Sequence, residues 1–360
     1  MHDGNSSEAD RGSVERAVPE EPTYVHGGTG PGPRTTQTTS TGVGDRRRGG
    51  RRREGGERAM VPREKPSSYY GRPVIKPPVW TWEIPTYFFT GGLGGASATF
   101  ALAAGLTGNR TLARRSWLIA FGALAVSPLL LTSDLGKPMR FLNMLRVFKV
   151  TSPMSVGSWV LTLGATATAP AAASAFLGRD LPGARAARFI AGALGLPVAT
   201  YTAVLVSNTA VPVWSEARWE LPLSFAASAA ASAGAAATLA TPVELAAPAR
   251  RLAIGGAVVE SAMTELMDRR LGELGEPYRE GASGRLAKAA KALTVVGAIA
   301  MASGARRSRP VVAAGAAALL AGSVCERWAV FKAGFASAED PKYTVGPQRE
   351  RAADRSAPDP

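Results

Sequence analysis

The residues of this sequence best suited to chemistry are a few carboxylic acids and tyrosines that interrupt long apolar stretches. Glu83 and Tyr87 begin one such stretch and lie four residues apart, which places them on one face of a helix. Tyr201 lies in the later half of another stretch, where a buried hydroxyl needs a hydrogen-bond partner. Glu260 follows a run of apolar residues in a third. Ionisable groups within lipid are costly and usually mark a pathway or a site, so these residues are the first candidates for one.

Histidine and cysteine, the usual ligands of protein-bound metals, are almost missing from the sequence. The histidines are His2 and His26, and the single cysteine is Cys325, which suits a small packing residue. A membrane haem takes axial His, Met or Cys ligands, and an iron–sulfur cluster takes several thiolates. We therefore expect no iron–sulfur cluster, no metal site and no haem, apart from one held by methionines alone. If this chain takes part in redox chemistry, the electrons must therefore enter from another subunit or reside on a diffusible cofactor.

Long apolar stretches make up most of the sequence and decide its class. The mean hydropathy of the whole chain is near zero because a charged N-terminal tail offsets them. A bilayer core of ~30 Å needs about 20 helical residues, and backbone groups in lipid must be paired internally. We therefore predict an all-α integral membrane protein with eight transmembrane helices, arranged as two four-helix bundles. The stretches are residues 84–106, 117–133, 154–177, 189–211, 221–240, 248–267, 289–304 and 310–334.

The segments outside these stretches are predicted to be tails. Residues 1–79 are rich in Gly, Ser, Thr, Pro and charge, so we expect a disordered basic tail. Its arginines, Arg46–Arg48 and Arg51–Arg53, could attract anionic lipid headgroups or simply help to fix topology. The membrane domain is expected to cover residues 80–335, with a C-terminal tail over residues 336–360. The lipid bilayer is the expected surface partner, and no nucleic acid is expected.

Eight spans put both termini on one side of the membrane, which we call the tail side. Its loops are residues 134–152, 212–220 and 268–288. Basic residues are nearly balanced between the loops of the two sides. When the basic residues that flank the first and last spans are included, the tail side carries more Lys and Arg. Because cytoplasmic loops carry an excess of these residues, we expect the tail side to be cytoplasmic.

Polar residues inside the spans gather in the tail-side half of the expected bundle. Ionisable groups in lipid are costly and usually mark a pathway or a site, so we predict a polar cavity that opens toward one side. Glu326 and Arg327 could instead form a structural ion pair, or one of them could partner Asp134. The converging residues are Glu83, Tyr87, Asp134, Ser155, Trp159, Tyr201, Asn208, Glu260, Glu265, Glu326 and Arg327. Several aromatic residues have a simpler explanation as interfacial belts; these are Trp80, Trp82, Tyr87, Trp159, Trp214 and Trp219.

The loop after the second span is amphipathic. Its apolar residues alternate with basic ones, as expected of a helix that lies at the membrane interface. Pro153 then begins the third span at its favoured first position. We predict a docking surface for a partner here, formed by Lys137, Arg140, Arg146 and Lys149.

Several motifs, in order over roughly residues 80–342, give the chain a family resemblance. They are Trp80-x-Trp82-x-x-Pro85-x-Tyr87-Phe88-Phe89-x-Gly91-Gly92, the loop Asp134-Leu135-Gly136-Lys137-Pro138-x-Arg140-Phe141, Ser152-Pro153-Met154-Ser155, Tyr201 followed by Pro212-x-Trp214, and Arg327. With them the chain resembles the NrfD/PsrC-type membrane subunits of bacterial oxidoreductase complexes. These are related to polysulfide reductase and to formate-linked molybdoenzymes.

The resemblance implies an eight-helix subunit of the bacterial inner membrane that holds no haem and binds a quinone, such as menaquinone. The quinone would lie near the side where an iron–sulfur subunit docks. Electrons would pass through that subunit to a molybdenum-containing catalytic subunit, such as a formate dehydrogenase, because this chain itself carries no molybdenum. The subunit would then react with quinone but would not be catalytic alone.

The resemblance also implies roles for individual residues. Glu83, Tyr87 and Tyr201 would hold the quinone headgroup and relay protons, with Asp134 and Trp159 also lining the binding site. Some members carry a histidine in the first pair, where this chain has Tyr87. Beyond the headgroup site, Glu260, Glu265 and Arg327 could form a proton path toward the opposite face.

Two other functions fit parts of the sequence. A secondary transporter would hold its substrate near mid-membrane, which suits Glu260 and the helix-interrupting Pro197. Such transporters contain internal repeats, and none is visible in this sequence. A passive anchor that merely tethers a redox enzyme is the third hypothesis, and a quinone-site inhibitor would separate it from the first.

Overall fold

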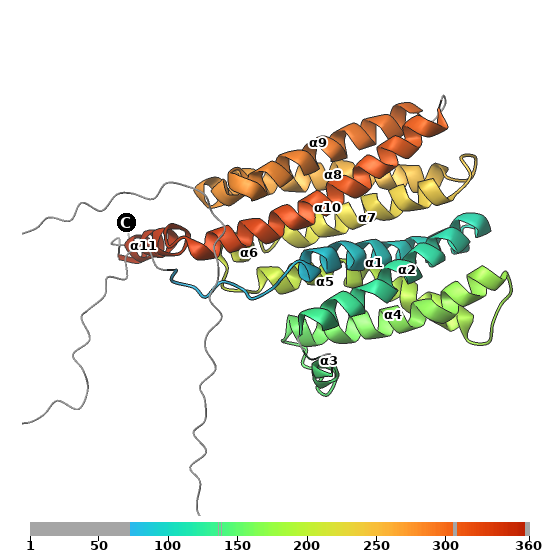
Figure 1. Cartoon of the computed structure of the whole chain (residues 1–360), viewed down its shortest axis with the longest axis horizontal. Coiled ribbons are helices and arrows are strands. Elements are labelled where there is room, and N and C mark those ends of the chain that lie inside the picture. Colours follow the sequence, from blue (N-terminus) through green and yellow to red (C-terminus); the bar gives the residue numbers. More distant parts are fainter. Residues whose placement is uncertain (1–72, 136, 138, 305–307, 357–360) are drawn as a thin grey trace, which may run out of the picture. The chain divides into compact units, whose positions relative to one another are not determined.

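The computed structural model describes residues 73–135, 137, 139–304 and 308–356 (Figure 1). Most of the predicted disordered tail, residues 1–72, therefore lies outside the described part of the chain, as do Gly136 and Pro138 of the amphipathic loop. In the described part the regular structure is helical throughout, and no strand is present. The fold class predicted from the apolar stretches is confirmed at this level.

Long helices alternate with short helical segments along the chain (Figure 1). The long helices are α1 (Glu83–Leu106), α2 (Arg110–Asp134), α4 (Pro153–Leu177), α5 (Ala184–Ser207), α7 (Glu220–Ala240), α8 (Ala247–Leu271), α9 (Gly281–Gly304) and α10 (Arg309–Glu339). The short ones are α3 (Arg140–Met144), α6 (Pro212–Glu216), the 3-10 helix η1 (Gly272–Tyr278) and α11 (Lys342–Ser356). The last long helix thus continues beyond the apolar stretch, and α11 follows within the expected C-terminal tail.

Among the described residues, seven helices are long and apolar enough to cross a membrane. They are all the long helices except α8, which carries charged residues at both ends and Glu260 within it. Seven spans of the predicted eight are therefore supported by length and composition. The chain is a multi-pass membrane protein.

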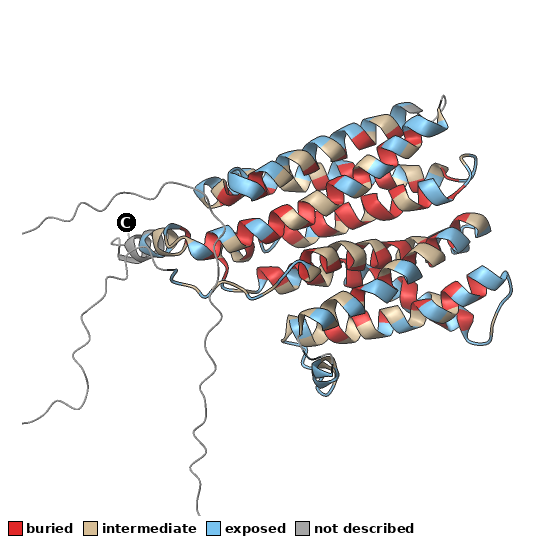
Figure 2. Ribbon diagram, viewed as in Figure 1, coloured by how far each residue is buried: buried red, intermediate tan, exposed pale blue. Residues whose placement is uncertain are grey.

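The long helices pack in two neighbouring sets. Helices α1, α2, α4 and α5 contact one another, and α9 packs along α10 as α8 packs along α7. Helix α7 joins the sets because it also contacts α1, α5 and α10. In the most apolar segment of α7, 61 % is buried inside the protein, whereas the corresponding share for α9 is 22 % (Figure 2). Helix α7 is therefore central, whereas α9 presents most of its surface to lipid.

Small residues let these helices approach each other backbone to backbone. Gly95 of α1 lies directly against Gly195 of α5, as expected from the glycine-rich start of the first span. Gly256 of α8 lies against α7, where a Cβ atom would sit 2.5 Å from the Ala231 nitrogen. Gly255, the preceding residue, faces open space. An added methyl group would therefore clash with α7 at Gly256 but not at Gly255.

We predict that Gly256→Ala destabilises the protein by about 1–3 kcal/mol, because its methyl group would overlap the α7 backbone. The measurement is thermal unfolding of the purified protein in detergent. Gly255→Ala is the matched control, since it brings the same gain in helix propensity without a clash. Equal melting temperatures for the two variants would contradict the close α7–α8 contact.

At the tail side, α11 is attached to η1 by a charged contact. Lys342 Nζ lies 2.7 Å from Glu276 Oε2, and the Tyr343 hydroxyl donates a hydrogen bond of 3.0 Å to the same oxygen. Hydrogen bonds from Lys342 and Tyr343 lower the pKa of Glu276 below its ordinary value of 4.5. The contact is thus strongest when Glu276 is ionised.

We predict that this attachment is present above pH 4.5 and is lost as the pH falls through the lowered pKa of Glu276. Amide hydrogen exchange in α11, corrected for the intrinsic pH dependence, should report the loss. Glu276→Gln should show the weaker protection already at neutral pH, whereas Glu273→Gln, an exposed neighbour in η1, should not. Unchanged protection in Glu276→Gln would show that other contacts hold α11.

Candidate functional site

Two tyrosines from different helices meet within the membrane domain. The ring centroids of Tyr87 on α1 and Tyr201 on α5 are 6.4 Å apart, with an interplanar angle of 58°. Tyr87 is 1 % exposed, and its buried hydroxyl has no hydrogen-bond partner among the described residues. Gly157 of α4 lies against the Tyr201 ring, where any Cβ atom would overlap it. The sequence prediction that Tyr87 and Tyr201 come together agrees with this geometry.

Glu83 lies one turn before Tyr87, at the half-exposed start of α1. Thr81 Oγ1 donates a hydrogen bond to Glu83 and lies 3.2 Å from Asp134 Oδ1 at the end of α2. The Thr81 amide also donates to Asp134, at 3.4 Å. Thr81 therefore joins the two predicted carboxyls at the tail side, and Asp134 holds the chain that leads into α1.

Trp159 of α4 packs on the amphipathic loop. Its ring meets Phe148 edge to face with centroids 6.3 Å apart, and its buried indole nitrogen has no hydrogen-bond partner among the described residues. Ser155 fixes the loop, because its hydroxyl donates to the Val147 carbonyl at 2.9 Å and accepts from the Lys149 amide at 3.0 Å. The regular helix in this loop, α3, is only five residues long.

The predicted docking residues are all on the surface. Lys137, Arg140, Arg146 and Lys149 are exposed. They lie beside exposed apolar side chains of the same loop, including Leu142 and Val147. The loop therefore offers positive charge and apolar surface together at the tail side.

A buried charge cluster, formed by Glu260, Glu326 and Arg327, lies between α7, α8 and α10. Glu260 is 5 % exposed, Glu326 8 % and Arg327 1 %. Arg327 Nη1 lies 3.5 Å from Glu326 Oε2, and Glu260 interacts with both of these groups and with Ser228. Ser224 donates a 2.7 Å hydrogen bond to Glu326 Oε1. Two carboxylates facing one guanidinium leave one negative charge uncompensated, which a proton held on either carboxyl removes.

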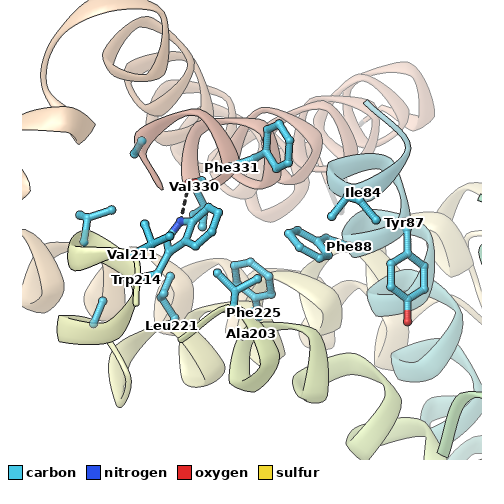
Figure 3. Packing of buried hydrophobic residues seen from close by; sticks show 14 of the residues in the cluster. Ile84, Tyr87, Phe88, Ala203, Val211, Trp214, Leu221, Phe225, Val330 and Phe331 are labelled. Carbon is cyan, nitrogen blue, oxygen red and sulfur yellow. Dashed lines mark hydrogen bonds between the residues drawn. The ribbon is translucent and has the colours of Figure 1, made fainter. Parts of the chain in front are cut away.

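Arg327 is held mainly by Phe225 of α7. Its Nη2 donates to the Phe225 carbonyl at 3.0 Å, and its Cζ lies 3.6 Å from the centre of the Phe225 ring. Figure 3 shows Phe88 of α1 between Phe225 and Tyr87. Centroid distances of 6.0 Å from Phe225 to Phe88 and 6.3 Å from Phe88 to Tyr87 make this a continuous aromatic contact. The tyrosine pair and the buried charge cluster are therefore connected through packed rings.

Glu265 differs from Glu260 in its surroundings. It forms ion pairs with Arg269 and Lys291 near the surface, at 3.0 and 3.1 Å. Yet Glu260, Glu265 and Lys291 line one cavity of about 60 Å³, large enough for a few waters. Apolar side chains form much of its wall, and hydroxyl-bearing residues also line it; the latter are Ser224, Ser261, Thr264, Tyr278 and Thr294.

Two sequence interpretations need correction. Trp214 does not belong to an interfacial belt, because it is fully buried and donates a 2.8 Å hydrogen bond to the Val330 carbonyl (Figure 3). Its ring stacks on Trp80 and fits against Gly334, which has no side chain to exclude it. Tyr87 is no belt residue either, because it is 1 % exposed. Of the two alternatives offered for Glu326 and Arg327, the structure contains the ion pair between them.

Sequence reasoning also missed residues around the cluster, notably Phe225 and the serines of α7. Ser224 and Ser228 lie four residues apart in an alanine-rich helix, so they form a polar line along one face. That spacing was the available signal. Ser228 meets Ser323 of α10 at 2.9 Å, which continues the polar line across the helix interface.

We predict that Arg327→Met lowers the free energy of unfolding by about 3–5 kcal/mol, because it leaves buried carboxyls without their counter-charge. Adding Glu326→Gln should recover part of the loss. Thermal unfolding in detergent measures both effects. Lys332→Met, the same type of change at an exposed position of α10, serves as the control. If Arg327→Met melted like Lys332→Met, the cluster would not stabilise the fold.

No group of three or more His, Cys, Asp or Glu residues in the described part of the chain could hold a metal ion. No curated protein matches the chain. Residues 73–249 match a family model described as polysulphide reductase, NrfD. This region contains α1 to α7, and with them both tyrosines, Glu83, Asp134 and the amphipathic loop. On this match the chain belongs to the NrfD family, whose members are membrane subunits of multi-subunit oxidoreductases.

Proposed function

We propose that the chain is the quinone-reactive membrane subunit of an oxidoreductase complex. It would exchange electrons between a docked iron–sulfur subunit and menaquinone or another quinone. The observation that carries this proposal is the buried Tyr87 hydroxyl, which has no hydrogen-bond partner among the residues that the structure describes. It lies beside Tyr201 in the region matched by the family. A buried hydroxyl left without a partner is costly, and a ligand carbonyl oxygen would satisfy it.

The residues present suit a quinone headgroup. A bound quinone supplies a carrier of two electrons and two protons. Tyr87 and Tyr201 would donate hydrogen bonds to its carbonyl oxygens and so orient the headgroup. Trp159 offers a further buried N–H group without a protein partner. Glu83, half-exposed and one turn from Tyr87, takes protons from water and passes them inward. Asp134 keeps Glu83 in place through Thr81.

The partner subunit is proposed to dock on the tail side. The exposed basic residues of the amphipathic loop would attract an acidic surface, and the neighbouring apolar side chains would be covered on docking. The partner is an iron–sulfur protein that continues to a molybdenum-containing subunit, such as a formate dehydrogenase. We place the complex in the bacterial inner membrane, with both termini of this chain in the cytoplasm.

We propose that α8 is the eighth span and that the long helices form two four-helix bundles. Helix α8 is 25 residues long, which is enough to cross a bilayer. Its interior carboxyl, Glu260, faces Arg327 and Ser228 within the buried charge cluster and is not exposed to lipid. Helices α1, α2, α4 and α5 form the first bundle, and α7 to α10 form the second. The buried charge cluster and its cavity, with Glu265 at the surface, are the proposed start of a proton path.

We predict that Tyr201→Phe and Tyr87→Phe each lower quinone turnover by about 100-fold, the usual effect of removing one preorganised donor. The assay is quinone reduction or quinol oxidation by the intact purified complex. Tyr343→Phe, which removes a hydroxyl outside the proposed site, is the matched control. Assembly of the complex should be unchanged in all three variants.

The outcomes separate the competing functions. Unchanged turnover in both tyrosine variants would remove the tyrosine pair from the quinone site. If a partner with iron–sulfur absorbance still copurified and a quinone-site inhibitor had no effect, the chain would be a passive anchor. A preparation without such a partner would overturn the proposal.

A further inference from the structure

A cavity at the end opposite the tail side has no part in the proposed function. It lies at the connection between α1 and α2 and the connection between α4 and α5, and its volume is about 700 Å³. Cavities of ~300–1,000 Å³ commonly hold small ligands. The charged residues on its wall are Asp180 and five arginines; the arginines are Arg110, Arg114, Arg179, Arg185 and Arg188.

Two of these arginines are fixed by the protein. Arg114 Nη2 donates to the Phe176 carbonyl at 2.8 Å. Arg188 donates to the buried Ser174 hydroxyl at 2.5 Å and forms a 2.9 Å ion pair with Asp180. Ser174 in turn donates to the Arg179 carbonyl at 2.8 Å, which closes the α4–α5 loop around the cavity. The wall is therefore built, and Asp180 is already paired.

The other three arginines are free to bind a ligand. The guanidinium groups of Arg110, Arg179 and Arg185 make no hydrogen bond or ion pair with any residue that the structure describes. Guanidinium groups bind phosphate oxygens in a bidentate manner. Their shared cavity thus has unsatisfied capacity for an anion.

Helix geometry strengthens the positive potential in this cavity. Arg110 and Arg114 lie in the first turns of α2, and Arg185 and Arg188 lie in the first turns of α5. A helix N-terminus carries partial positive charge, so arginines at these positions are repelled unless an anion lies between them. Neither first turn contains an acidic residue that would relieve the repulsion.

Apolar side chains beside the cavity indicate what kind of anion binds. Phe176 and Leu177 end α4, while Phe189 and Ile190 follow the arginines on α5, and all four are exposed. A free phosphate ion would leave these side chains uncovered. A phospholipid would place its phosphate among the arginines and its acyl chains against the apolar residues.

We propose that this cavity binds the headgroup of an anionic phospholipid at the membrane surface opposite the tail side. The cavity's position at the ends of four spans puts it at headgroup level. This inference depends on the membrane location of the chain and not on its redox function.

The test compares lipid binding by the purified full chain and by two double variants. Native mass spectrometry during titration with phosphatidylglycerol or phosphatidylcholine gives the preference for the anionic lipid. Arg110→Gln with Arg185→Gln should lower the affinity for phosphatidylglycerol by about tenfold or more. Arg115→Gln with Arg251→Gln removes the same charge from exposed arginines outside the cavity, and it should leave the affinity nearly unchanged.

Arg179→Gln alone, which changes neither helix start, should show a smaller loss of the same kind. Thermal unfolding confirms that each variant is folded. Equal preference for phosphatidylglycerol in all variants, or equal binding of phosphatidylcholine by the unaltered chain, would overturn the proposal. So would displacement of the lipid by millimolar inorganic phosphate, because the occupant would then be a free anion.

Discussion

A charge placed within lipid has to be partnered inside the protein. This constraint is strictest for Arg327, which is more deeply buried than Glu260 and Glu326. It is almost fully buried in α10, and its partners lie on α7, α8 and α10 itself. Its guanidinium also approaches Gly92 of α1, where a Cβ atom would lie 3.8 Å from Nη2. One side chain therefore touches or faces four long helices. Their relative positions are fixed by the need to surround it.

The small residues of the sequence make that arrangement possible. Polar contacts such as Ser228 to Ser323 require helix axes to come close, and side chains larger than alanine at the crossing points would prevent it. Gly256 and Gly234 bring α8 and α7 into backbone contact, and Glu260 lies one turn after Gly256. Close packing and charge burial are thus parts of one solution, because the carboxyl reaches its partners only when the helices nearly touch.

Local sequence patterns predicted the helices and offered the Glu326–Arg327 ion pair as one alternative, but they did not predict that Glu260 joins it. Depth alone placed Tyr87 and Tyr201 in the tail-side half of the bundle, and the family resemblance implied that they share one headgroup site. Glu260 of α8 interacts with Glu326 of α10, and the depth of a residue in its span does not tell which helices are neighbours. Trp214 was misplaced for a related reason. Its position near a span end resembles that of a belt residue. The Trp214 ring fits inside the protein because Gly334 has no side chain that would overlap it.

The aromatic contact between the two polar regions has a consequence for the proposed chemistry. Phe88 and Phe225 lie between Tyr87 and Arg327, so packed aromatic rings occupy the space that separates them. Charges interact strongly across such a medium, since its effective dielectric constant is far below that of water. Negative charge developing on a headgroup beside Tyr87 would therefore attract the Arg327 guanidinium. Such an effect requires no helix to move, because the rings and the guanidinium are already in contact.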